Sequence, residues 1–167
     1  MAIDNTTLES RLLQNGCVVL YHNPFLMEEH SGLLVASGWA FKEIYVAEQG
    51  TQDELYDQVA GSLSFPNYFG RNLDALRDCM SELDFSETPR LALGLIRFHA
   101  LAHRDSVFAH AVLNIFAEME RGCLMKGRRV MFMVQSDDPN LHFPEVGATP
   151  VLWNFEEWLD SNRKNKQ

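Results

Sequence analysis

Four short, unbroken apolar runs constrain the fold of this chain more than any other feature of its sequence. They cover residues 17–21 (CVVLY), 44–47 (IYVA), 91–96 (LALGLI) and 130–134 (VMFMV). Alternation of apolar and polar residues is typical of strands with one face in water, whereas an unbroken run indicates a strand buried on both faces. We therefore predict four strands that belong to a parallel sheet.

Amphipathic helical patterns separate the strand-like runs. The first follows a capping-box sequence at residues 51–54 and repeats apolar residues every fourth position up to Leu63. Asn72 is expected to cap a second helix. The apolar stripe of this second helix consists of Leu73, Leu76, Met80 and Leu83. Strands that alternate with helices are typical of an α/β layer fold.

Two further helices are expected in the second half of the chain. One opens at residues 105–106 and is expected to end at Gly122, because glycine commonly follows the last helical turn. Another is expected over residues 155–163, with Asn154 at its cap and Glu157 at its third position. Trp39, Trp153 and Trp158 are interpreted as core or packing aromatics.

The charge of the chain restricts its partners. The 167 residues include 14 Lys and Arg against 23 Asp and Glu, which gives a net charge of −9. Residues 43–87 hold ten of the acids and only Arg71 and Arg77 as cations, a net charge of −8 for this stretch. General nucleic-acid binding needs cationic side chains, so we expect no direct contact with nucleic acid. A basic partner suits this charge better.

No cofactor, metal or membrane association is indicated. Cys17, Cys79 and Cys123 show no CxxC spacing and are expected to be buried thiols. The three histidines of the central region lack the spacing of a zinc site; they are His99, His103 and His110. The first residues, MAIDNTTLESR, do not resemble a secretory signal, and no apolar run is long enough to span a membrane. A cytoplasmic location is therefore expected.

The stretch FPNYFGRNLDALRDC, residues 65–79, holds the most unusual combination of side chains. If the apolar stripe faces inward, an outward face is shared by Asp74, Arg77, Asp78 and Ser81. Two aromatic residues, Tyr68 and Phe69, precede the helix, and Gly70 would permit a sharp turn between them and its cap. This face is either a surface for contact with a partner or an ordinary solvated helix face.

The same stretch resembles the pattern of the barstar family of intracellular ribonuclease inhibitors. The matching positions are Pro66, Tyr68, Phe69, Gly70, Asn72, Leu73, Asp74, Ala75, Leu76, Asp78 and Cys79. Residues 112–123 (VLNIFAEMERGC) are similar to a later helix of the family, and the resemblance covers about residues 40–137. It implies a three-stranded parallel sheet flanked by helices.

The resemblance also implies roles for individual residues in binding a nuclease toxin. Asp78 would take the position of a phosphate, with Asp74 as a second acceptor, and Tyr68 would stack on the partner. The remaining residues of the expected binding surface are Phe69, Gly70, Asn72, Arg77, Ser81 and Glu118. Of these, Glu118 is equally well explained as a solvated helix carboxylate.

Two departures from the family pattern affect which nuclease is expected as the target. Arg77 stands where the family often has an aromatic residue, and Arg71 stands where an acid is frequent. Both cations would repel a uniformly basic cleft or pair with an acid on it, so the target need not be barnase itself.

The resemblance divides the expected globular unit into three parts. Residues 40–138 form the barstar-like domain, residues 1–39 form an N-terminal extension packed on it, and residues 139–167 form a C-terminal extension with a helix. The N-terminal extension is expected to add a strand and a helix.

The resemblance, together with the acidic charge, implies the function of an immunity protein. Such a protein is not an enzyme but an inhibitor that blocks the active site of a bacterial nuclease toxin with an acidic helix. Two alternatives stay open: a barstar-like interaction module with no nuclease target, and a small hydrolase that uses Asp74, Asp78 and a histidine.

Overall fold

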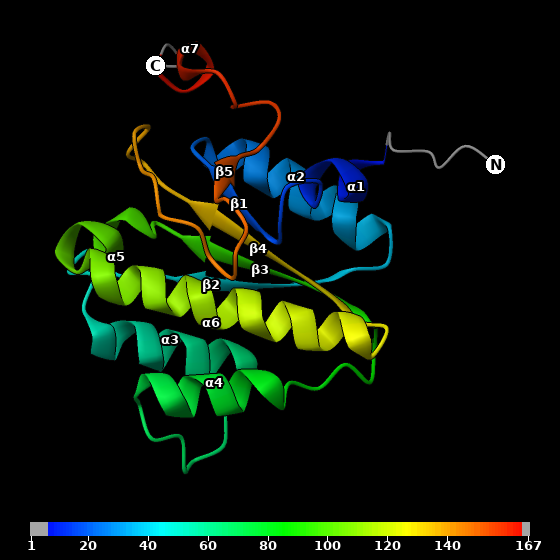
Figure 1. Ribbon diagram of the computed structural model, residues 1–167, viewed down its shortest axis with the longest axis vertical. Coiled ribbons are helices and arrows are strands. Elements are labelled where there is room, and N and C mark those ends of the chain that lie inside the picture. Colours follow the sequence, from blue (N-terminus) through cyan, green and yellow to red (C-terminus); the bar gives the residue numbers. More distant parts are fainter. Residues whose placement is uncertain (1–6, 165–167) are drawn as a thin grey trace.

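The predicted strands lie in one parallel sheet of a computed structural model that describes residues 7–164 (Figure 1). Within these residues the sheet has five strands in the order β2-β3-β4-β1-β5, and every neighbouring pair is parallel. The strands are β1 (Val18–Tyr21), β2 (Ala40–Tyr45), β3 (Arg90–Ile96), β4 (Arg129–Gln135) and β5 (Leu152–Trp153). The predicted α/β class is therefore confirmed.

Helices cover both faces of the sheet and leave two apolar cores. One face packs against α1 (Leu8–Leu12) and α2 (Pro24–Ala36). The other face packs against the larger core, which is formed with the helices α3 (Gln52–Leu63), α4 (Leu73–Ser81), α5 (His99–Arg104) and α6 (Ser106–Met125). In this layer α4 packs on α6 and lies farther from the sheet than α6 does (Figure 1). The layer therefore presents α4 to the outside.

Strand β2 differs from its prediction because it lies at the edge of the sheet. It begins at Ala40, four residues before the predicted run, and ends at Tyr45. Ile44 is buried, whereas Lys42, Glu43 and Tyr45 are exposed. The expectation of burial on both faces holds for the inner strands β1, β3 and β4. It is wrong for β2, whose side chains at the edge of the sheet are only partly covered.

Helices α6 and α4 end at other residues than predicted. Gly122 lies inside α6, which continues to Met125, and the backbone reaches the left-handed region only at Gly127 (φ +73°). A single glycine inside a helix costs about 1 kcal/mol, which the packing of a 20-residue helix offsets. Leu83 lies beyond the end of α4 but still packs, half-buried, against the core.

The helix predicted over residues 155–163 is largely absent, and only α7 (Asp160–Lys164) forms in this region. The Asn154 side chain accepts from Glu156 N at 3.0 Å and donates to Leu20 O at 3.0 Å, so it serves a turn beside the sheet. Trp158 is 51% exposed, which corrects its assignment to the core, whereas Trp39 is buried and Trp153 is half-buried.

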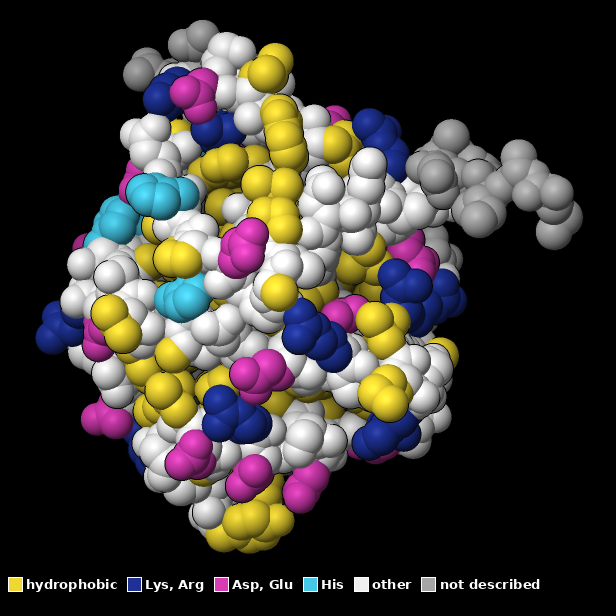
Figure 2. Space-filling view, viewed as in Figure 1, with side chains coloured by type: hydrophobic (Ala, Val, Ile, Leu, Met, Phe, Trp, Pro, Cys, Tyr) yellow, Lys and Arg dark blue, Asp and Glu magenta, His cyan; other side chains and the backbone are white. Residues whose placement is uncertain are grey.

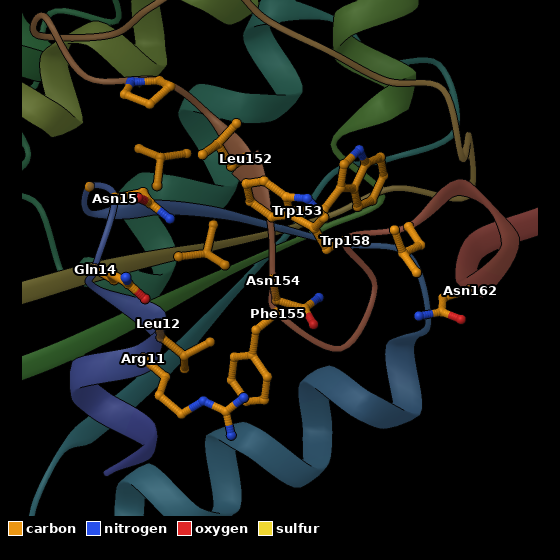
Figure 3. Close-up of a pocket in the computed structure, with 15 residues that line it drawn as sticks. Arg11, Leu12, Gln14, Asn15, Leu152, Trp153, Asn154, Phe155, Trp158 and Asn162 are labelled. Atoms are coloured by element: carbon orange, nitrogen blue, oxygen red, sulfur yellow. The ribbon is translucent and has the colours of Figure 1, made fainter. Parts of the chain in front are cut away.

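The first and last segments of the described chain are held together by buried polar contacts. Glu157 is fully buried, and its carboxylate accepts from His22 N at 2.8 Å and from Asn23 N at 2.9 Å. Between these segments lies a hollow of about 460 Å³, in which the Arg11 guanidinium is 3.6 Å from the centre of the Phe155 ring (Figure 3). The C-terminal segment thus closes the β1 side of the sheet, and β1 pairs with β4 on its other side.

The cysteines are free and buried, as predicted. Burial raises the pKa of Cys17 to about 12. Across residues 7–164, no three His, Cys, Asp or Glu side chains are grouped as metal ligands would be. Nor does any helix of this part of the chain have the length and apolar character needed to cross a membrane.

Candidate functional site: the outward face of α4

Helix α4 is fixed by a cap at one end and by three buried residues along its length, Leu76, Cys79 and Met80. Asn72 accepts from Ala75 N at 2.8 Å through its side-chain oxygen and donates to Gly70 O at 3.2 Å through its amide nitrogen. Leu76 and Met80 are fully buried against α6 and the core. A helix held in this way presents its outward side chains in one orientation.

The outward face predicted from the sequence is observed. Asp74, Arg77, Asp78 and Ser81 are all exposed. Arg77 bridges two carboxylates, with Nη1 at 3.2 Å from Asp74 Oδ1 and Nε at 3.1 Å from Glu118 Oε2 on α6. Because the Asp74 side chain is 92% exposed, this ion pair contributes little to stability. The bridge links α4 to α6 and partly neutralises the charges of Asp74 and Glu118.

Asp78 is the acid of this face that no internal group engages. Within residues 7–164, its carboxylate takes part in no hydrogen bond or ion pair, since the cation beside it, Arg77, is shared by Asp74 and Glu118. The Ser81 hydroxyl donates to the backbone carbonyl of Asp78 at 2.7 Å and leaves the carboxylate untouched. The Asp78 carboxylate is therefore available to a donor from outside.

The two adjacent aromatic residues before α4 lie in different environments. Tyr68 is 80% exposed. Phe69 is half-buried and packs edge-to-face on Tyr56 and Phe65, with ring centroids 5.8 and 5.0 Å apart. Phe69 thus anchors the loop between α3 and α4, and Tyr68 projects from it.

The turn before α4 is made by Arg71 rather than by Gly70. Arg71 adopts a left-handed backbone (φ +53°), whereas Gly70 does not. A side chain on Gly70 would come within 3.3 Å of the Asn72 amide, so glycine here allows a close approach to the cap. The prediction that Gly70 supplies the sharp turn is wrong in this respect.

Arg71 is also engaged by acids that the sequence analysis did not connect with it. Its guanidinium pairs with Asp57 and lies 3.4 Å from Asp53 Oδ1, both on α3. The hydrogen bond to Asp57 raises the pKa of Arg71. The four-residue spacing of Asp53 and Asp57, one helical turn, was the signal that could have revealed this contact.

Negative charge is concentrated around the outward face. Figure 2 shows acidic side chains gathered at the lower end of the view, where Figure 1 places α4. The acidic residues exposed on α4, at its end and beside it on α6 are Asp74, Asp78, Glu82 and Glu118. A surface of this kind attracts a basic partner.

The arrangement required for a hydrolase is not assembled. All six histidines lie within residues 7–164, and none of them contacts Asp74 or Asp78 through a hydrogen bond or an ion pair. The Nε2 atom of His103, for example, lies 2.8 Å from Oδ2 of Asp138, a residue of the loop after β4. Neither carboxylate of α4 therefore has an imidazole base beside it.

The parallel sheet and the outward acidic helix define an α/β protein that offers a rigid anionic surface. The family model described as "Barstar (barnase inhibitor)" matches residues 39–136, more than half of the chain. The chain therefore belongs to the barstar family, a family of barnase-type ribonuclease inhibitors rather than enzymes. No curated protein sequence matches the chain.

The matched segment corresponds to one side of the molecule. It contains the three adjacent strands β2, β3 and β4 with the helices α3 to α6, which agrees with the three-stranded sheet implied by the resemblance. Strands β1 and β5 lie outside the match and enlarge the sheet to five strands. The helices outside the match are α1, α2 and α7.

Proposed function

We propose that this chain is a cytoplasmic immunity protein that binds a bacterial ribonuclease, or a related nuclease toxin, and blocks its active site with the outward face of α4. The observation that carries the proposal is the Asp78 carboxylate. It is exposed on a capped helix, no cation of the described chain engages it, and the chain belongs to the barstar family.

The chemistry of a nuclease active site fits such a carboxylate. Nuclease clefts are lined by cationic side chains that stabilise the charge of the phosphoryl transition state. A carboxylate at the phosphate position accepts charge-assisted hydrogen bonds from the same groups. Because the Asn72 cap and the buried Leu76 already hold α4 in place, little conformational entropy is lost when Asp78 enters the cleft.

The surrounding residues would define the rest of the contact. Tyr68, free of internal packing, would lie against a side chain at the mouth of the cleft, while Phe69 supports the loop from behind. Gly70 and Asn72 shape that loop, and Ser81 extends the face along α4.

The cation of the face would decide which nuclease is bound. Arg77 keeps Asp74 and Glu118 partly neutralised, so a matching target must either replace this cation with its own or offer an acid to it. Arg71 would repel a basic cleft less than its charge indicates, because Asp53 and Asp57 already pair with it.

The charge of the chain would accelerate capture of the toxin. The net charge of −9 is concentrated in residues 43–87, which include all of α4. Complementary charge raises the association rate of two proteins, and salt suppresses this effect. Binding to the nuclease should therefore slow markedly as the salt concentration rises.

The test is the Asp78→Ala variant, measured against barnase and against any nuclease domain encoded beside the gene for this chain. We expect the affinity to fall by about 2–5 kcal/mol, or about 30-fold and more, while the free energy of unfolding in urea changes by less than about 0.5 kcal/mol.

A matched control is Glu48→Ala, which removes an exposed acid from the same acidic segment, in the loop between β2 and α3. Equal loss of affinity in both variants would reduce the role of Asp78 to net charge. A wild-type chain that inhibits no nuclease, and binds its partner independently of salt, would instead be a barstar-like interaction module.

A further inference from the structure

A second feature of the α4 side of the molecule is a cavity between α4 and the C-terminal half of α6. Its volume is about 250 Å³, and its apolar wall is formed by Phe85, Ile115, Met119 and Cys123. Three residues of its rim, Arg77, Ser81 and Glu118, also belong to the proposed nuclease-binding surface. A partner seated on that surface would therefore reach the cavity.

Gly122 lines the cavity without contributing a side chain to it. It lines the cavity from inside α6, and a Cβ atom placed on it would meet no atom within 4 Å. Its backbone has ordinary helical geometry, so the fold does not require glycine at this position. Glycine costs a helix about 1 kcal/mol relative to alanine, so the chain forgoes helix stability at a position that lines the cavity.

The rim of the cavity carries positive charge, in contrast to the rest of this acidic surface. Lys126 and Arg128 line the cavity, and within residues 7–164 neither forms an ion pair. The Arg128 guanidinium lies 5.1 Å from the centre of the Phe85 ring, which places its charge over the apolar wall. A group that enters beside these two cations is favoured if it is anionic.

We propose that the cavity receives one apolar side chain of the bound nuclease, and that this side chain is flanked by a carboxylate that pairs with Lys126 or Arg128. The inference rests on the proposed function and specifies the surface of the partner. Asp78 meets the cationic cleft of the nuclease, and the cavity meets an apolar residue with an acidic neighbour outside that cleft. A buried apolar anchor of this kind separates matched from unmatched nucleases.

The first test adds a side chain to the cavity lining by the substitution Gly122→Leu. Because leucine is a better helix former than glycine and meets no atom at its Cβ, we expect an unchanged or higher urea midpoint. The affinity for barnase, or for the nuclease domain encoded beside the gene, should fall at least tenfold. The control is Gly61→Leu, a glycine inside α3 with equally empty surroundings and no part in the cavity wall, which should leave the affinity unchanged.

The second test is the charge reversal Lys126→Glu, for which two accounts predict opposite signs. If the nuclease offered only basic groups to this side of the chain, the added acid would strengthen binding. The proposal requires weaker binding, by at least fivefold and mainly through faster dissociation, with Lys126→Gln intermediate. The urea midpoint of each variant shows whether removal of this cation from the end of α6 also destabilises the fold.

The outcomes distinguish this inference from the function on which it rests. If Asp78→Ala abolishes inhibition but Gly122→Leu binds like the wild type, or if Lys126→Glu binds more tightly, the cavity proposal is overturned and the proposed function stands. If the wild type inhibits neither nuclease, both are overturned. Weaker binding by both cavity variants, with unchanged controls, supports the proposal.

Discussion

The outward face of α4 and the buried contact of the C-terminal segment use carboxylates in opposite ways. Asp78 is exposed and has no partner within residues 7–164, whereas Glu157 is 0% exposed. The Glu157 carboxylate accepts from His22 N, Asn23 N and the Asn154 amide at 2.8–2.9 Å. The fold has already satisfied Glu157, and it leaves Asp78 for another molecule to satisfy.

The tyrosines of the two regions show the same difference. Tyr21 is fully buried on β1, and its hydroxyl lies 2.7 Å from His30 Nδ1, while His30 Nε2 lies 2.6 Å from Glu156 Oε2. Burial raises the pKa of Tyr21. Tyr68 lies in the loop between α3 and α4 and is 80% exposed. Polar groups of the terminal segments therefore stabilise the fold, whereas the exposed side chains of Asp78 and Tyr68 are expected to be replaceable with little loss of stability.

The largest effect expected from this comparison is on stability, in the variant Glu157→Ala. Removal of the carboxylate leaves two backbone N–H groups at the end of β1 without an acceptor in the interior. We expect the free energy of unfolding to fall by about 3 kcal/mol in urea titrations, with inhibition per folded molecule unchanged. A loss below about 1 kcal/mol would show that this buried contact does not hold the terminal segments together.

A smaller effect, on binding alone, is expected for Tyr68→Ala. An exposed aromatic residue that becomes buried in an interface often contributes about 2 kcal/mol to binding. The free energy of unfolding should not change, because Tyr68 makes no core contact. Tyr45→Ala, an exposed tyrosine of β2, provides the control, and equal effects of both variants on affinity would contradict the assignment of Tyr68 to the binding surface.

The smallest effect concerns pH and His99, the first residue of α5. Burial lowers the pKa of His99, and its Nδ1 accepts from Asp137 N at 3.0 Å, a bond that requires the neutral ring. The groups around it act in both directions, since Asp137 and Asp138 raise this pKa while Arg97 and His103 lower it.

The sign of the pH dependence follows from the lowered pKa. The unfolded chain binds a proton at His99 more readily than the native chain, so stability decreases as the pH falls below about 6.5. Urea midpoints measured from pH 7.5 to 5.5 should show this decrease, and His99→Gln should reduce it. A midpoint that rises on acidification would contradict the assignment, whereas the affinity of the α4 face should be unaffected by the substitution.

The sequence predicted the inner strands because their apolar runs are long and buried on both sides. It misplaced β2, since an edge strand carries exposed residues such as Lys42, and it missed β5, which has only two residues. It also assigned a helix to the residues after Asn154, because Asn154 and Glu157 have the spacing of a helix cap. In the structure these two side chains instead form hydrogen bonds with the backbone of β1 and of the residue that follows it. That contact joins residues 135 positions apart, which no local pattern encodes.

For the candidate site, the outward placement of Asp74 and Asp78 could be predicted from the helical period of the apolar stripe. The engagement of Arg77 by Glu118 could not, because it depends on how α4 packs on α6. The cavity beside Gly122 was likewise hidden, since a glycine near the end of a helix pattern resembles a helix stop.

The central claim is that the Asp78 carboxylate occupies the phosphate position of the nuclease, and competition with inorganic phosphate tests it most directly. The dissociation constants of the wild type and of Asp78→Ala are measured against the inhibited nuclease, with and without phosphate at constant ionic strength. We expect phosphate to weaken the wild type at least tenfold more than the variant, because only the wild type must displace it. Equal weakening of both would show that Asp78 lies elsewhere in the complex and would contradict the account.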